Sequence, residues 1–356
     1  MTYQLNEKLR GFQPYTPVQE DPDIIHLDAN ECGINLPQSL LEQAAAEIPQ
    51  ISFNRYPDAY AADLCEAFAG FYGINPAHVT AGNGSDELIG LLVSAFLMKG
   101  ETMLTTDPDF SMYTFYPLLA ETPYVLVNKG DSFEISADSL IEQAKACKAR
   151  LVLFSNPCNP TSIGLPKEEV VRILRGLPDT LVVVDEAYMD FWEPAQSLLG
   201  DEDAYDNLVI LKTCSKMGLA ALRLGFAVAN PRLTGVLHVV KSVYNVNTMT
   251  QRVAAVVLRE KETLRRQIKE TIQSRDYLQA QLQNLLDAHP GAFRLYPSAA
   301  NFVTICTPNA ADLHAFLMKR KVSVRKFPGM LRITAGTVQE DDAFLASLRA
   351  FLEESK

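Results

Sequence analysis

The sequence lacks the cysteine and histidine patterns that mark several common protein classes. Its six cysteines include no CxxC pair, and its five histidines are isolated, with no HExxH motif. The scattered cysteines argue against a disulfide framework or a zinc knuckle, and they fit a reduced, cytoplasmic protein. Each histidine is more simply explained as a surface or packed side chain than as a metal ligand. We therefore expect no metal site.

The spacing of the glycines excludes further classes of enzyme. No two glycines lie four residues apart, so the GxSxG nucleophile elbow is absent. No two lie five apart, which excludes the P-loop. Gly82 and Gly84 begin a GxG pattern, but Glu87 occupies the third glycine position of the usual dinucleotide fingerprint.

Long apolar runs and basic runs are also missing. The longest largely apolar stretch, Leu88–Met98, is too short to span a bilayer, and the polar N-terminus has no signal-peptide apolar block. The net charge is −11, and no lysine- or arginine-rich run offsets it. This charge argues against a general nucleic-acid binder. We expect neither nucleic acid nor membrane as a partner.

The order of the expected elements indicates two lobes. A chain of 356 residues is too long for one simple core. Up to about residue 250, apolar strands alternate with helices, which predicts a parallel sheet. Residues 251–289 contain no glycine or proline and predict one long helix or two abutting ones. We expect an N-terminal arm and part of a small domain in 1–50, a large domain in 51–250, and a connector helix with a small α+β domain in 251–356.

Polar residues follow the expected strands of the large domain. Because parallel strands share one carboxyl edge, the residues there should meet on one side of the sheet: Asn159, Asp185, Tyr188 and Lys216. The glycine-rich turn 82–87 opens a buried helix, so its backbone N–H groups could bind a phosphate. An ordinary helix capped by Ser85 explains that turn equally well.

Lys216 lies shortly after an apolar strand, Leu208–Leu211. It could be an amine in a dry pocket, able to form a Schiff base beside an anion held by Ser215 and Arg223. On this segment alone, a loop lysine and a salt-bridged arginine are the simpler explanation. Asp185, at the end of another buried strand, requires a cation to offset its burial.

Two arginines lie seven residues apart in the small domain. Arg325 and Arg332 fall in separate expected strands. In an acidic protein they form a plausible anion clamp for a substrate. Two ordinary edge-strand arginines are the alternative.

Eight motifs, taken together and in order, resemble the aspartate-aminotransferase superfamily of pyridoxal-phosphate (PLP) enzymes, and within it the histidinol-phosphate aminotransferases most closely. They are Leu27–Glu31, Arg55–Asp58, Gly82–Glu87, Asn156–Thr161, Val184–Tyr188, Thr213–Lys216, Tyr244–Asn247 and Leu331–Thr337. The resemblance implies the α/β fold of fold-type I PLP-dependent transferases, with a large domain around a mostly parallel sheet and a small α+β domain.

The resemblance also assigns roles around the cofactor ring. Lys216 would carry the cofactor as a Schiff base and then move the proton of the substrate. Asp185 would pair with the pyridinium nitrogen. Asn159 and Tyr188 would hold the 3-oxygen of the ring, and Phe110 would stack on its face.

Charged groups of the cofactor and the substrate have implied partners too. The cofactor phosphate would be held by Ser85, Asp86 through its backbone N–H, Ser215 and Arg223, with Tyr56 reaching in from a partner subunit of a homodimer. The substrate-binding residues would be Asn30, Arg325 and Arg332. Of these, Arg332 would bind the substrate carboxylate, and Arg325 would bind the phosphate of histidinol phosphate or share the anion with Arg332.

The expected function is an aminotransferase that moves an amino group between glutamate or 2-oxoglutarate and an amine or amino acid, foremost histidinol phosphate. The alternatives on the same scaffold are an aromatic amino-acid aminotransferase and a threonine-phosphate decarboxylase. A ligand-sensing domain is the alternative from another class. It would require an N-terminal helix-turn-helix, and the first motif already begins at Leu27.

The sequence departs from the family pattern at several positions. Ser162 stands where the family has a glycine. The loop from Lys216 to Arg223 is one residue shorter than usual, and the segment from Arg325 to Arg332 is short. Residues 241–243 replace the usual prolines before Tyr244.

Overall fold

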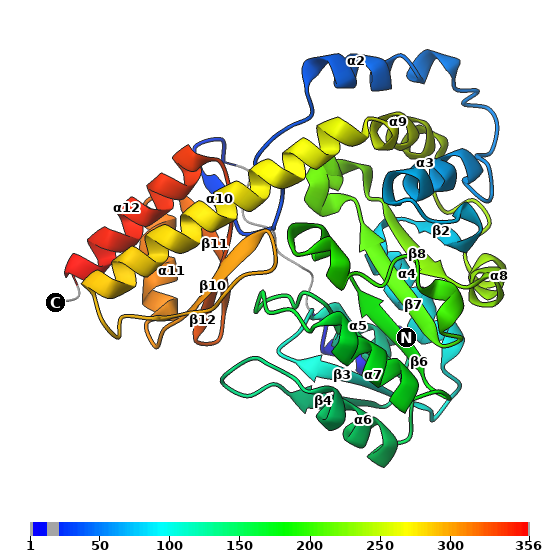
Figure 1. Ribbon diagram of the computed structural model, residues 1–356, viewed down its shortest axis with the longest axis horizontal. Coiled ribbons are helices and arrows are strands. Elements are labelled where there is room, and N and C mark those ends of the chain that lie inside the picture. Colours follow the sequence, from blue (N-terminus) through cyan, green and yellow to red (C-terminus); the bar gives the residue numbers. More distant parts are fainter. Residues whose placement is uncertain (1–2, 13–20, 355–356) are drawn as a thin grey trace.

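A computed structural model describes residues 3–12 and 21–354 and shows two lobes, each built around its own sheet (Figure 1). The larger sheet has seven strands in the order β2-β8-β7-β6-β5-β3-β4. Their bounds are β2 Val79–Gly82, β3 Thr102–Asp107, β4 Tyr124–Asn128, β5 Ala149–Ser155, β6 Leu181–Asp185, β7 Leu208–Thr213 and β8 Gly225–Ala229. The strands are parallel except β8, which runs antiparallel to both of its neighbours. The expected parallel sheet is therefore confirmed, with one exception.

Both faces of this sheet are covered, because its strands are apolar on both sides. In β6, Val182 and Val184 pack into one core and Val183 into the core on the opposite face. One face carries α3 Ala62–Tyr72, α6 Ala137–Ala146, α7 Lys167–Gly176 and α9 Thr248–Arg259. The other carries α4 Gly84–Phe96, α5 Met112–Leu119 and α8 Pro231–Val240.

The smaller sheet has five strands in the order β1-β11-β12-β10-β9. They are β1 Ile25–Leu27, β9 Arg294–Leu295, β10 Phe302–Cys306, β11 Val322–Phe327 and β12 Met330–Thr334. The N-terminal strand β1 pairs in parallel with β11, so the start of the chain completes the C-terminal lobe. Apolar residues of α10 Lys261–Ala288, α11 Ala310–Lys319 and α12 Val338–Glu354 form the core of this lobe with the sheet.

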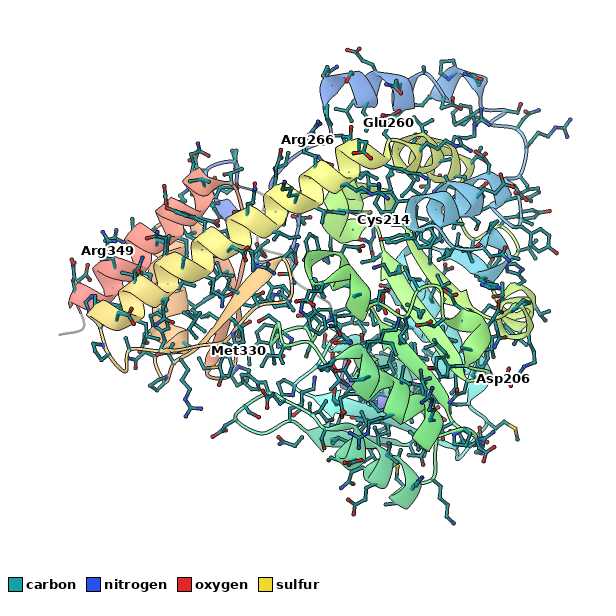
Figure 2. The ribbon with its side chains drawn as sticks, viewed as in Figure 1. Asp206, Cys214, Glu260, Arg266, Met330 and Arg349 are labelled. Atoms are coloured by element: carbon teal, nitrogen blue, oxygen red, sulfur yellow. The ribbon has the colours of Figure 1, made fainter. Side chains whose placement is uncertain are left out.

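The segment expected as one long helix or two abutting helices is divided at Glu260 into α9 and α10 Lys261–Ala288 (Figure 2). Helix α9 packs in the core of the large sheet beside α2 Gln38–Ala45, whereas α10 runs from the large lobe across the small one (Figure 1, yellow). Within 3–12 and 21–354, no helix is long and apolar enough to cross a membrane.

The expected N-terminal arm contains one short helix, α1 Glu7–Arg10, and residues 1–2 and 13–20 of it lie outside the described residues. The remaining short helices connect the larger elements. They are η1 Ile48–Gln50, η2 Pro76–His78, η3 Met189–Phe191, η4 Pro194–Gln196, η5 Glu202–Ala204, η6 Ser215–Leu219 and η7 Ala220–Leu222.

Candidate active site

Lys216 lies in η6, the irregular helical turn that directly follows β7. Its Nζ donates a hydrogen bond to the Ala29 carbonyl oxygen at 3.1 Å and lies 6.0 Å from the centre of the Tyr188 ring. Burial, reinforced by the positive charge of Arg332, lowers the pKa of the Lys216 amine to about 8. An amine that loses its proton this close to neutral pH can act as a nucleophile and as a base.

Asp185 ends strand β6 and is only 3% exposed. Its Oδ2 accepts a hydrogen bond from the Tyr113 hydroxyl at 2.8 Å, and its Oδ1 accepts one from the Ala187 N–H at 3.0 Å. No lysine, arginine or histidine in the described part of the chain forms an ion pair with it. Burial accordingly raises the pKa of the Asp185 carboxyl to about 6. Such a carboxylate is suited to a cation that the chain itself does not supply.

Asn159 and Tyr188 are both buried and meet residues that come from the small lobe or the N-terminal segment. The Arg332 guanidinium donates to Asn159 Oδ1 at 2.5 Å and to the Asp28 carbonyl oxygen at 2.6 Å. The Asn30 side-chain amide donates to the Tyr188 hydroxyl at 2.9 Å. The structure thus brings Asn30 and Arg332 to Tyr188 and Asn159 at the carboxyl edge of the large sheet.

The glycine-rich turn after β2 forms a narrow cradle. Gly84 has a φ of +77°, and a Cβ there would lie 3.3 Å from the Arg223 guanidinium. A Cβ on Gly225 would lie 2.2 Å from the Ser85 backbone nitrogen, so only glycine allows this close approach. Arg223 Nη1 is 3.5 Å from Ser215 Oγ. The turn, the serine and the arginine therefore lie next to one another.

Ser85 and Asp86 lie in the first turn of α4, where backbone N–H groups have no partner within the helix. The alternative in which Ser85 caps this helix is wrong, because α4 begins at Gly84 and Asn83 holds the cap position. With Ser85 inside the turn, its N–H remains available to an anion.

Phe110, Arg325 and Tyr56 differ in how close they come to this cluster. The Phe110 ring meets the Tyr113 ring edge to face, with 5.6 Å between their centres. Arg325 lies directly opposite Arg332 in the β11–β12 pair. Tyr56 is 80% exposed and stacks on Tyr244, so within one chain the structure leaves it outside the cluster.

Three polar residues beside the site were not identified from the sequence. The Tyr113 hydroxyl donates to Asp185, and Asp109, which forms an ion pair with Lys129, accepts from the Phe110 backbone N–H. Their position at strand ends was a possible signal, since Asp109 follows β3 and Lys129 follows β4. Which of them face inward depends on how α5 and the loops pack.

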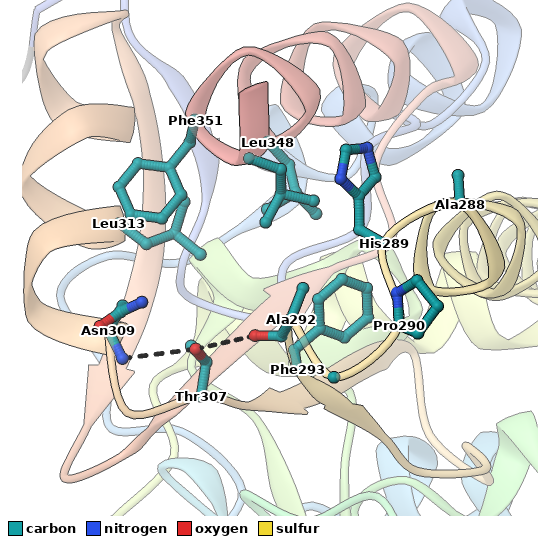
Figure 3. Close-up of a pocket in the computed structure, with 12 residues that line it drawn as sticks. Ala288, His289, Pro290, Ala292, Phe293, Thr307, Asn309, Leu313, Leu348 and Phe351 are labelled. Carbon is teal, nitrogen blue, oxygen red and sulfur yellow. Dashed lines mark hydrogen bonds between the residues drawn. The ribbon is translucent and has the colours of Figure 1, made fainter. Parts of the chain in front are cut away.

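A pocket elsewhere in the molecule has a different character. It lies in the small lobe between the end of α10, α11 and α12 (Figure 3). Its polar lining residues bond to the chain itself: Thr307 Oγ1 donates to the Ala292 carbonyl oxygen and accepts from the Asn309 N–H. None of the expected site residues lines it.

The residues at the sheet edge fit PLP in three respects. Asp185 is a buried carboxylate without a cation, as a ring nitrogen that carries a proton would require. Lys216 is an amine with a lowered pKa. The cradle of Gly84 and Gly225 provides N–H groups and Arg223 for a phosphate.

The family model described as aminotransferase class I and II matches residues 22–348 of this chain. The chain belongs to this family. It is 35% identical over 353 residues to a histidinol-phosphate aminotransferase of Clostridium kluyveri, covering 98% of each chain. It is 38% identical to the histidinol-phosphate aminotransferase of Thermococcus kodakarensis, covering 97% of each.

The fold is similar to the crystal structure of histidinol-phosphate aminotransferase from Sinorhizobium meliloti in complex with pyridoxal-5'-phosphate. The TM-score is 0.86 at 21% identity, covering 100% of this chain and 99% of that one. The expected family, a fold-type I PLP-dependent aminotransferase, and its α/β fold class are thereby confirmed. The individual roles of the site residues stay predictions.

Proposed function

We propose that this aminotransferase moves an amino group between histidinol phosphate and 2-oxoglutarate, with PLP bound at the carboxyl edge of the large sheet. Relatives named histidinol-phosphate aminotransferase match nearly the whole chain. The observation that carries the substrate proposal is the placement of Arg325 directly opposite Arg332. Two guanidinium groups on neighbouring strands provide two positive charges and several hydrogen-bond donors for the anionic groups of a substrate.

In this proposal, Lys216 transfers the proton of the substrate and Asp185 stabilises the positive charge on the ring nitrogen. When bound, PLP supplies a ring that withdraws electrons from the reacting carbon of the substrate. Asp185 holds a negative charge where the ring nitrogen keeps its proton. Lys216, with its pKa lowered to about 8, takes a proton from the substrate carbon and returns it.

The two arginines allow one site to accept both substrates. Glutamate has carboxylates and histidinol phosphate has a phosphate, and a guanidinium binds either anion through two hydrogen bonds. Arg332 is fixed by Asn159 and the Asp28 carbonyl oxygen, so it provides the defined anion position. Arg325 supplies the second positive charge, and Asn30, bonded to Tyr188, lies beside them.

The direct test is turnover. The purified protein, loaded with PLP, is mixed with histidinol phosphate and 2-oxoglutarate, and glutamate formation is measured. Aromatic amino acids and threonine phosphate are run in parallel. Borohydride should fix the cofactor covalently on Lys216. Faster turnover of an aromatic donor than of histidinol phosphate, or release of carbon dioxide without glutamate, would contradict the proposed substrate.

The protein also functions as a cytoplasmic homodimer in this proposal. The segments around Tyr56 and Tyr244 present exposed apolar side chains that a second copy could cover. These are Phe53, Tyr56, Tyr60, Val239, Val243 and Tyr244. Tyr56 stacks on Tyr244 at this face, and from there it would reach the phosphate turn of the partner subunit.

A complementation experiment tests this arrangement. Tyr56→Ala and Lys216→Ala are each expected to be impaired alone. A mixed dimer has one site with an intact Lys216 and an intact Tyr56 from the other chain, so mixing should restore activity. The shared-site arrangement would be wrong if the protein sediments as a monomer, or if mixing the two variants restores no activity.

A further inference from the structure

A buried carboxylate beside the proposed cofactor site accepts several hydrogen bonds. Asp109 Oδ2 accepts from the Thr106 hydroxyl at 2.5 Å and from Lys129 Nζ at 3.2 Å. Its Oδ1 accepts from the Phe110 N–H at 2.8 Å and from the Ser155 hydroxyl. The Asp109 side chain is 2% exposed. This carboxylate therefore ties together the ends of β3 and β5 and the loop that carries Phe110.

Lys129 compensates the charge of Asp109 from the end of β4. Its side chain is 3% exposed, and its Nζ also donates to the Pro108 carbonyl oxygen at 3.1 Å and to Cys158 Sγ at 2.9 Å. Burial alone would lower the pKa of Lys129, but the nearby Asp109 and Cys158 raise it, so the amine stays charged. The hydrogen bonds of its Nζ go to the two loops that carry Phe110 and Asn159.

A chain of hydrogen bonds runs from this ion pair to the substrate arginine. Ser155 Oγ, which donates to Asp109, accepts from the backbone N–H of Asn159 at 3.1 Å. The Asn159 side chain in turn accepts from Arg332 at 2.5 Å. Asp109 is bonded directly to the Phe110 backbone and, through Ser155, to the Asn159 backbone. A shift of Asp109 would therefore move both the Phe110 ring and the Asn159 side chain.

We propose that Asp109, Lys129 and Ser155 are positioning residues for the reaction: they hold Phe110 and Asn159 at the distance that the cofactor ring requires. The proposal rests on the proposed function, because it presumes a ring between those two residues. The three residues touch neither cofactor nor substrate in this scheme and act through Phe110 and Asn159. A rigid supporting shell of this kind sets how well a site binds its ligand.

The test compares PLP affinity, measured by absorbance titration, with unfolding free energy of the cofactor-free protein. Asp109→Asn and Lys129→Met each break the ion pair. Ser155→Ala leaves the pair intact and removes only the hydroxyl that links it to Asn159. We expect PLP to bind at least about tenfold more weakly to the first two variants and several-fold more weakly to the third, because one bond in the chain is worth that much.

Matched controls come from α12, remote from these loops. Asp341 is a fully buried carboxylate bonded to Ser274 and to the Gly336 N–H, and Ser347 is a buried serine bonded to the Ala343 carbonyl oxygen. Asp341→Asn and Ser347→Ala therefore make the same chemical changes elsewhere. Ser347→Ala should lower the unfolding free energy, whereas Asp341→Asn, at a carboxyl whose pKa burial raises to about 6, should raise it at pH 8. Both variants should leave the PLP dissociation constant within twofold of the unmodified chain.

The outcomes separate the two proposals. If the unmodified chain does not bind PLP, the proposed function fails before the inference is tested. If it binds PLP, and Ser155→Ala and Lys129→Met lose stability with unchanged PLP affinity, as Ser347→Ala does, the cluster is structural only and the inference is overturned. If either of the ion-pair variants does not fold, Ser155→Ala alone decides the result, since it retains both charges.

Discussion

Two lysine–aspartate groups lie at the same edge of the large sheet, and they differ in how their charges are compensated. Lys129 and Asp109 form a buried ion pair with each other. Lys216 and Asp185 do not: the lysine has a carbonyl oxygen as its hydrogen-bond partner, and the aspartate has a tyrosine hydroxyl and a backbone N–H. The pKa of Lys129 is raised, whereas the pKa of Lys216 falls to about 8 and that of Asp185 rises to about 6.

This difference indicates which group supports the fold and which awaits a ligand. A buried charge with its counter-ion in the chain is stable as it stands. A charged acid or amine that is buried without a counter-ion destabilises the free protein. A bound cation or a covalent partner removes this cost of burial. The contrast can be tested by changing one group at a time.

The largest effect is expected from Lys216→Ala. Loss of the amine removes both the covalent attachment and the base, so kcat should fall by at least about a thousandfold. Borohydride should then fix no cofactor on the chain. Steady-state assays measure the loss, with Lys145→Ala as the exposed-lysine control. Turnover within tenfold of the unmodified enzyme would mean that Lys216 is not the reactive amine.

Replacing Asp185 or Asp109 with asparagine should change the unfolding free energy in opposite directions. In the cofactor-free protein, the raised pKa of Asp185 means that the folded state binds more protons than the unfolded state between about pH 4 and pH 6, so stability falls as pH rises through that window. At pH 8, Asp185→Asn should raise the unfolding free energy by up to about 3 kcal/mol, and the gain should vanish near pH 4.

Asp109→Asn should lower the unfolding free energy by about 3 kcal/mol, because it leaves Lys129 buried without its counter-ion. Urea unfolding at both pH values measures the two changes. Destabilisation by Asp185→Asn at pH 8 would remove the contrast between the acids.

A smaller effect is expected at the arginine that joins the lobes. Arg332→Ala should weaken binding of glutamate by roughly 2 kcal/mol, because a charge-assisted pair is lost. Arg332→Lys keeps the charge but not the paired hydrogen bonds, so it should recover only part of the affinity. The KM for glutamate measures both. An unchanged KM in Arg332→Ala would assign the carboxylate to another residue.

The smallest effect is expected at Ser162, in the loop that follows β5. Ser162 stands at the family's glycine position and adopts a φ of +66°, and its hydroxyl donates to the Pro297 carbonyl oxygen at 3.2 Å. Ser162→Ala loses this bond and keeps the strained backbone, whereas Ser162→Gly relieves it. The glycine variant should therefore be more stable than the alanine variant by about 1 kcal/mol. Thermal unfolding compares the two, and an alanine variant of higher stability would contradict the strain.

Much of the local structure could be predicted from the sequence. The apolar strand expected at Leu208–Leu211 is β7, and the helical segment expected over 251–289 is α9 and α10. Such features depend on side chains within one element, whose periodicity and caps are visible in the sequence. The antiparallel course of β8 was not predicted, because strand direction depends on where the chain re-enters the sheet.

The sequence by itself determined that an amine, an acid and a glycine-rich turn follow strand ends and that two arginines lie in neighbouring strands, which was enough to recognise the chemistry. Only the tertiary structure decided which of them meet. Arg332 bonds to Asn159 across 173 residues, and Asp109 finds Lys129 from a different strand. The physical reason is that charge compensation and pKa depend on burial and on distances of a few ångströms between remote side chains, neither of which a local pattern encodes.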